Sequence, residues 1–164
     1  MLKKILKFVH EIGAIGVLGA IASCIVLVAT APTQSLAQFA VVRQSVVAVQ
    51  QWILLPSLLL VLVSGLLSIA ANGVFMNAGW AWIKALLGVS MFEGSLLTIS
   101  SRAREAADLS ALAVAGQGNP QLLAEALRTE WGGLWIIAAV SVANVVLAVW
   151  RPRFVSSSSS RADS

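Results

Sequence analysis

Cysteine and charged residues are scarce in this chain. The first scarcity excludes certain kinds of site, and the second excludes a class of protein. The single cysteine, Cys24, excludes an intrachain disulfide and any metal or iron–sulfur site built from several cysteines of one chain. Charged residues are only 11% of the 164 residues and hydrophobic residues are 59%, which is too apolar for an ordinary soluble domain. Neither a phosphate-binding loop nor a dinucleotide-binding fingerprint occurs, so no motif indicates an enzyme class.

Long apolar stretches are what the sequence has in abundance. They cover Phe8–Ala31, Trp52–Ala71, Trp80–Ser101 and Trp131–Trp150. About twenty apolar residues suffice for a helix to cross a bilayer, and all six tryptophans lie near the ends of these stretches, as expected at a membrane interface. We therefore expect an all-α integral membrane four-helix bundle in residues 1–155, followed by a disordered polar tail in residues 156–164.

Two of the connections also have helical character. Gln34–Gln51 lacks glycine and proline, and Arg102–Glu130 is interrupted only around Gly116–Pro120. Both connections lie on the same side of the bundle, so we expect helical extensions to protrude there, where they could bind a partner protein. Pro56 is expected to bend the second long helix.

The net charge of +4 comes from basic residues that flank the apolar stretches, a pattern typical of anchoring at an anionic leaflet rather than of nucleic-acid binding. An even number of spans places both termini on one side. The positive-inside rule favours cytoplasmic termini, because that side carries six basic residues and the opposite side four. The six are Lys3, Lys4, Lys7, Arg151, Arg153 and Arg161, and the four are Arg43, Arg102, Arg104 and Arg128.

Four ionisable residues lie inside the expected spans, where charge is costly: His10, Glu11, Lys84 and Glu93. The first and third spans run in the same direction, so we expect His10, Glu11 and Lys84 to lie at similar depth and to be able to meet. Glu93 is nine residues beyond Lys84, which places it on the opposite face of the helix and about 13 Å deeper.

Three segments carry a family resemblance. The stretch Lys7–Gly13, the segment Gln51–Leu67 with Pro56 and Ser64-Gly65, and the stretch Gly79–Lys84 resemble an uncharacterised family of small bacterial inner-membrane proteins. That family is distantly similar to HemJ-type protoporphyrinogen oxidases and to the membrane domain of the copper-resistance protein CopD.

The HemJ-type resemblance implies a b-type haem held in the bundle, with a histidine early in the first span and a lysine early in the third. His10 and Lys84 occupy these positions. Because His10 is the only histidine, the second iron ligand would be Lys84 or Met91, or there would be none. A copper role like that of CopD would instead rest on His10, Met91 and Cys24.

Structural roles are open alternatives for each of these residues. His10 could bond a neighbouring helix or a headgroup, and Met91 could simply pack. Lys84 could pair with Glu11 or reach the interface past Trp80. Glu93 could form a structural hydrogen bond or handle protons.

Three functions remain open at this point. The first is a redox-linked haem protein, with His10 as the iron ligand. The second is a non-catalytic scaffold or assembly subunit that binds a partner through Gln34–Gln51 and Arg102–Glu130. The third is a small transporter or proton-handling unit built around Glu93.

Overall fold

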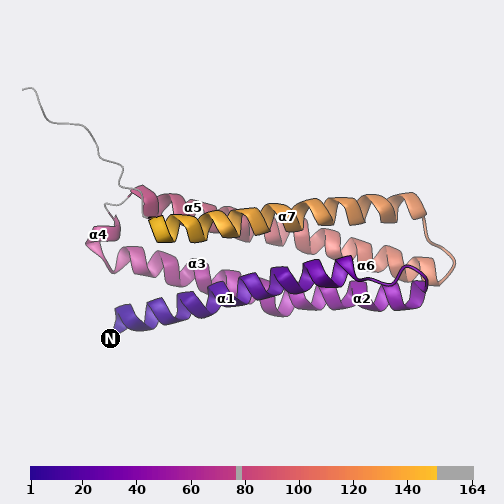
Figure 1. The fold of residues 1–164 in the computed structure, drawn as a ribbon, viewed down its shortest axis with the longest axis horizontal. Helices are drawn as coiled ribbons and strands as arrows, with labels where there is room; N and C mark the ends of the chain where they lie inside the picture. The colour runs from indigo at the N-terminus through magenta and orange to yellow at the C-terminus, as the bar shows by residue number, and fades with distance from the viewer. Residues whose placement is uncertain (77–78, 151–164) are drawn as a thin grey trace, which may run out of the picture.

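The computed structural model describes residues 1–76 and 79–150, which form one elongated helical bundle (Figure 1). No strand occurs within these residues. In chain order the helical segments are α1 (Leu2–Ala29), α2 (Leu36–Val49), η1 (Gln50–Leu54), α3 (Leu55–Ala70), α4 (Gly73–Met76), α5 (Gly79–Gly94), η2 (Ser95–Ile99), α6 (Ser100–Val114) and α7 (Pro120–Trp150). The tail expected to be disordered, residues 156–164, lies outside the described residues.

Four of the described helices are long and apolar enough to cross a membrane, because α2, η1 and α3 run on without a break, as do α5, η2 and α6. These four helices are Leu2–Ala29, Leu36–Ala70, Gly79–Val114 and Pro120–Leu147. Large apolar side chains point outward from them, such as Leu59, Ile136 and Val142. Outward-facing apolar side chains are typical of helices that contact lipid, so the all-α membrane bundle expected from the sequence is confirmed.

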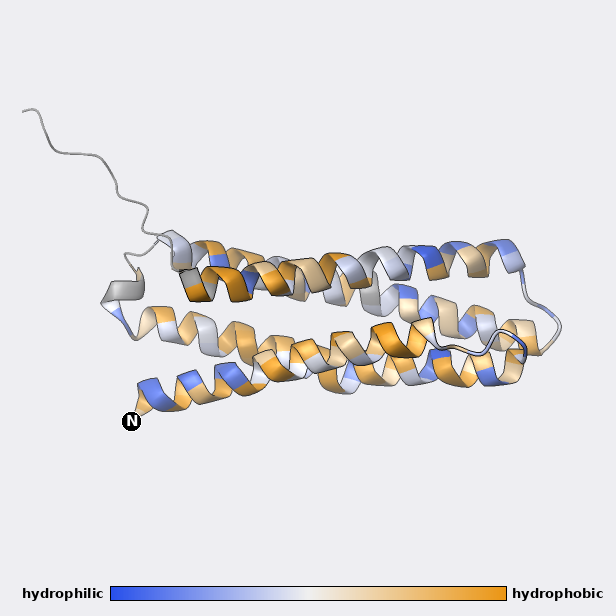
Figure 2. Cartoon of the chain, in the orientation of Figure 1, coloured by the Kyte–Doolittle hydropathy of each residue, from blue (hydrophilic) through white to orange (hydrophobic). Residues whose placement is uncertain are grey.

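The second and third long helices have 35 and 36 residues, more than a bilayer needs. At 1.5 Å per residue each is over 50 Å long, against a hydrocarbon core of roughly 30 Å. The surplus is α2 and α6, which pack against each other, and α6 packs in turn on the first half of α7. Figure 2 shows hydrophilic residues gathered at this end of the bundle, where the helical extensions were expected. We call it the extension end.

Glycine allows α1 and α3 to pack closely within the membrane. A methyl group added at Gly13 would lie 2.9 Å from Val61 Cγ2, and one added at Gly16 would lie 2.2 Å from Ser57 Oγ. Gly19, one turn further on, faces open space. Gly13 and Gly16 therefore serve helix packing, as their position inside an apolar stretch predicts, whereas Gly19 does not.

The turn between α6 and α7 has the residues that its geometry demands. Gly116 has a φ of +75°, which ends α6, and a side chain at Gly118 would overlap the backbone of Ala113. Asn119 then caps α7, because its Oδ1 accepts hydrogen bonds from the backbone N–H groups of Gln121 at 3.0 Å and Leu122 at 3.3 Å.

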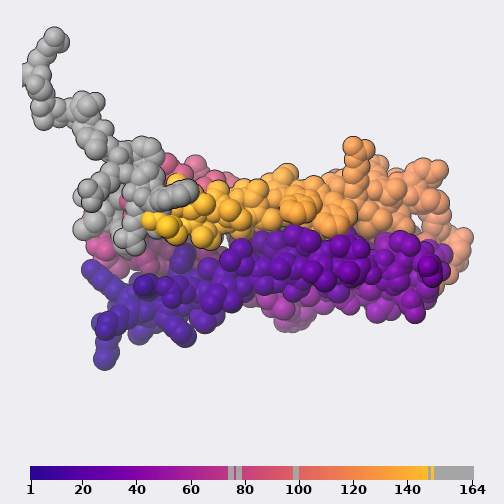
Figure 3. Space-filling view, in the orientation of Figure 1, coloured from indigo at the N-terminus to yellow at the C-terminus, as the bar shows by residue number. Residues whose placement is uncertain are grey.

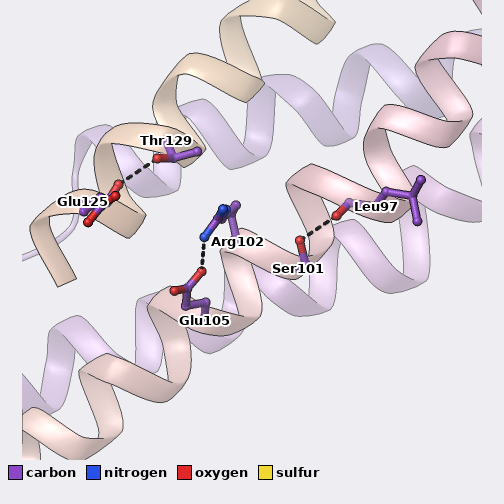
Figure 4. A network of polar contacts seen from close by, with 6 residues as sticks. All are labelled: Leu97, Ser101, Arg102, Glu105, Glu125 and Thr129. Carbon is purple, nitrogen blue, oxygen red and sulfur yellow. Dashed lines mark hydrogen bonds and ion pairs between the residues drawn. The ribbon is translucent and has the colours of Figure 1, made fainter. Parts of the chain in front are cut away.

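Two short π-helical segments, η1 and η2, lie within the continuous second and third long helices. The helix does not end at Pro56, which lies just after η1, so the missing N–H of proline is accommodated within a continuous helix. After η2, the Ser101 hydroxyl donates to the Leu97 carbonyl at 2.8 Å, and Arg102 pairs with Glu105 at 2.7 Å on the surface of α6 (Figure 4).

Candidate functional site

A cavity of about 640 Å³ opens between α1, α3, α5 and α7 at the end of the bundle where the chain begins. Figures 1 and 3 show α1 diverging from α7 toward the N-terminus. Its walls are mostly apolar, with a few polar side chains directed at it. We call it the His10 cavity, and its polar lining residues are Lys3, Lys7, His10, Glu11, Ser68, Asn72, Lys84, Ser141 and Asn144.

The imidazole of His10 is held in place by α3. Its Nδ1 lies 3.1 Å from the carbonyl oxygen of Val61 and 3.1 Å from Ser64 Oγ, whose own hydroxyl donates to the Leu60 carbonyl at 2.5 Å. A backbone carbonyl can only accept, so Nδ1 carries the proton in this arrangement. In the neutral ring Nε2 then carries a lone pair, the state that metal-ligating histidines require.

Gly65 of α3 lies beside the same ring. A methyl group added at Gly65 would lie 3.4 Å from His10 Cε1. The histidine therefore fits against a flat backbone surface, and its orientation is fixed both by packing and by the hydrogen bond to Val61.

Lys84 and Glu11 accompany His10, as the direction of the spans predicts. All three line the His10 cavity, and both charged groups are close enough to act electrostatically on the imidazole. The Glu11 carboxylate also pairs with the Lys7 ammonium one turn earlier, at 3.6 Å. The expected juxtaposition is thus present, while the assignment of His10 and Lys84 as ligands stays a prediction.

Met91 lines the same cavity from α5. Its side chain is buried, and its Sδ lies 3.5 Å from the Nδ2 of Asn144 on α7, which also donates to the Val140 carbonyl. Ser141, one turn from Asn144, is buried with no hydrogen-bond partner for its hydroxyl among the described residues. Ser141 and Asn144 were not identified from the sequence as part of the site. Two polar residues three positions apart inside an apolar span could have indicated them.

Cys24 is not part of this site. It lies fourteen residues beyond His10 on the same helix, about 21 Å along the axis, and is packed in the apolar core. A copper site made of His10, Met91 and Cys24 is therefore wrong. Within the described part of the chain, no group of three or more His, Cys, Asp or Glu side chains could hold a metal ion.

Glu93 is also separate from the cavity. Its side chain is exposed on the outer face of α5, opposite the face that carries Met91 into the bundle. A hydrogen bond to another span, one of the roles left open for Glu93, is therefore not formed within the described part of the chain. Glu93 lies nine residues after Lys84 and therefore on the opposite face of the helix, and this explains its outward position.

A second buried polar cluster lies at the extension end, away from the cavity. Arg43 of α2 pairs with Glu130 of α7, and neither side chain is exposed. Gln50, two turns beyond Arg43 on the same face, is also buried and lies beside the Cys24 thiol. From the sequence, Arg43, Gln50 and Glu130 were assigned to the connections between spans, and nothing in the sequence indicates that Arg43 and Glu130 meet.

One family model matches nearly the whole chain. It is described as a predicted integral membrane protein (DUF2269), and it covers residues 4–152. No curated protein and no solved structure matches the chain. The similarity to HemJ-type proteins and to CopD is not among these matches.

Proposed function

The chain belongs to the DUF2269 family of predicted integral membrane proteins, and we propose that it holds a b-type haem in the His10 cavity. In this proposal His10 ligates the iron through Nε2. A bound haem would supply one-electron redox chemistry, and the protein would supply the ligand, the apolar surroundings and the charges around it.

The observation that carries the proposal is the hydrogen bond from His10 Nδ1 to the Val61 carbonyl. Ligating histidines almost always donate their second ring nitrogen to a carbonyl or carboxylate, which fixes the tautomer and directs the other nitrogen at the metal. A histidine that only capped a neighbouring helix would not need to line a large cavity as well.

The cavity suits the chemical character of haem. Its volume of about 640 Å³ lies within the usual range of cofactor pockets, roughly 300–1,000 Å³, and its walls are mainly apolar. Lys3, Lys7 and Lys84 border it and are the groups that would balance the two propionates. Met91 and Lys84 also line the cavity and are the candidates for a second iron ligand.

The proposal extends to the location of the protein. We place it in the bacterial inner membrane with both termini in the cytoplasm, which puts the His10 cavity at the cytoplasmic side. The support is the cluster Lys3, Lys4 and Lys7 at the start of α1. A reporter fused to the C-terminus that becomes active only in the periplasm would contradict this orientation.

The geometry gives less support to a transporter than to a scaffold. A transport path through Glu93 needs that residue inside the bundle, and it lies on the outer surface. The protruding helices exist, and their exposed apolar residues such as Leu36 and Val41 leave room for a partner protein.

An absorption spectrum of protein purified in mild detergent tests the haem proposal. We expect a Soret band in the wild type that is lost in His10→Ala and retained in Leu59→Ala, a control on the outer face of α3. Circular dichroism and gel filtration report whether each variant is folded. A folded wild type that shows no Soret band even after incubation with hemin would overturn the proposal.

A further inference from the structure

Glu93 lies within the hydrocarbon layer by its position along a continuous helix. It is thirteen residues after Trp80 and nine before Arg102, which correspond to about 20 Å and about 14 Å along the axis. Tryptophan marks the interface at one end, and the charged start of α6 marks the other. The carboxyl group is therefore separated from both aqueous phases by more than a turn of helix.

The Glu93 side chain is exposed on the outside of the bundle, so in the membrane it faces lipid. Within the described residues no hydrogen bond or ion pair reaches it, whereas the carboxylates of Glu11, Glu105 and Glu130 pair with Lys7, Arg102 and Arg43. An ionisable group facing lipid costs a few kcal/mol or more, and such residues almost always face protein or water instead. A partner for this position is therefore to be sought outside the described part of the chain.

The surface around Glu93 is shaped for the close approach of a second helix. Leu86 and Leu97 lie on the same face and are 68% and 76% exposed, and the small Ser90 and Gly94 flank the carboxyl group. A methyl group added at Gly94 would meet nothing within 4 Å, so packing within the bundle does not require a glycine there. Small residues beside a polar one are typical of helix–helix contacts in membranes.

We propose that this face of α5 and η2 binds the same face of a second copy of the chain, with Glu93 of the two copies hydrogen-bonded to each other. Copies inserted in the same orientation hold Glu93 at the same depth, and a two-fold axis along the membrane normal brings identical residues together. A protonated carboxyl group both donates and accepts, so it is complementary to itself.

The positions of the cations in this chain favour the symmetric pairing over a pairing of Glu93 with a basic residue. Lys84 lies nine residues away on the opposite face of the helix, and Arg43 is buried against Glu130. Arg102 and Arg104 lie beyond the end of the span. In a parallel dimer, none of these described cations reaches the depth of Glu93.

Cysteine cross-linking in native membranes tests the interface directly. In a Cys24→Ala background, Ser90→Cys places a thiol on the proposed interface, and Val142→Cys places one on the exposed face of α7 as the matched control. Disulfides form only when the Cα atoms come within about 7 Å. We expect mild oxidation to convert most Ser90→Cys protein to dimer and little of the control, whereas equal cross-linking of the two would overturn the proposal.

Substitution of Glu93 tests the role of the carboxyl group. Glu93→Leu suits a lipid-facing position, so the monomer should fold and keep its thermal stability, while the dimer dissociation constant rises by about 3- to 30-fold. Glu93→Gln can still hydrogen-bond with its copy and should stay close to the wild type. Wild-type protein that is monomeric in bilayers, or Glu93→Leu protein that dimerises as tightly as the wild type, would overturn the proposal.

Discussion

The Arg43 guanidinium of α2 forms an ion pair with the Glu130 carboxylate of α7, and both side chains are completely buried. Like Ala40 and Ala126 on the same two helices, the pair is shielded from solvent. It therefore links two helices that are far apart in the sequence, at the level where the bundle leaves the membrane. Charge removed from water in this way is costly to leave uncompensated.

We expect Arg43→Met or Glu130→Leu alone to lower the free energy of unfolding by about 3–5 kcal/mol, because each leaves one buried charge without its partner. The double variant Arg43→Met with Glu130→Leu should be much closer to the wild type, since two apolar side chains can replace a buried ion pair. Thermal or denaturant unfolding in detergent measures the difference.

The matched control is the exposed pair of Arg102 and Glu105, whose side chains are 46% and 45% exposed. Arg102→Ala should cost about 1 kcal/mol or less, because solvent screens such a pair. A single Arg43 variant no more destabilised than Arg102→Ala would show that the buried pair is not a coupled unit.

The glycines of α1 should respond to substitution according to their contacts. Gly16→Ala would force a methyl group into Ser57 and should destabilise the protein by about 1–3 kcal/mol. Gly19→Ala meets nothing within 4 Å and should be neutral or slightly stabilising, because alanine is the better helix former. The melting temperatures of the two variants make the comparison, and equal destabilisation would contradict the close packing of α1 on α3.

Ser64→Ala tests how His10 is held. The variant removes one neighbour of Nδ1 but leaves the Val61 carbonyl, so the imidazole keeps its tautomer. On the haem proposal we expect haem affinity to fall by about tenfold or less, at the lower end of the effect of removing such supporting hydrogen bonds. Titration with hemin measures it, and a loss as complete as in His10→Ala would mean that Ser64 rather than Val61 fixes the ring.

On the haem proposal, spectroscopy can identify a second iron ligand besides His10. Met91→Leu and Lys84→Met each remove one candidate that lines the cavity. If Met91 is the ligand, its replacement should lower the reduction potential and change the spin state of the haem, since methionine ligation raises the potential. Lys84→Met would then leave the spectrum near that of the wild type, and the reverse result would assign Lys84.

Much of the fold could be predicted from the sequence because it follows from hydrophobicity and helix chemistry alone. The apolar stretches, the glycines at the α6–α7 turn and the cap at Asn119 are local signals, and each lies where it was expected. The meeting of His10, Glu11 and Lys84 was also accessible, because parallel spans must place their first turns in one leaflet. The four apolar helices could therefore be located approximately before any contact was known.

Contacts between distant segments could not be derived in the same way. The sequence determined that the chain has four segments able to cross a membrane as helices, because each is long and apolar enough and a helix satisfies its backbone hydrogen bonds internally. Only the tertiary structure decided that Arg43 meets Glu130 and that Asn144 joins Met91 at the cavity. The rotation of each helix about its own axis decides these pairings, and that rotation is set by side-chain packing between helices rather than by hydrophobicity.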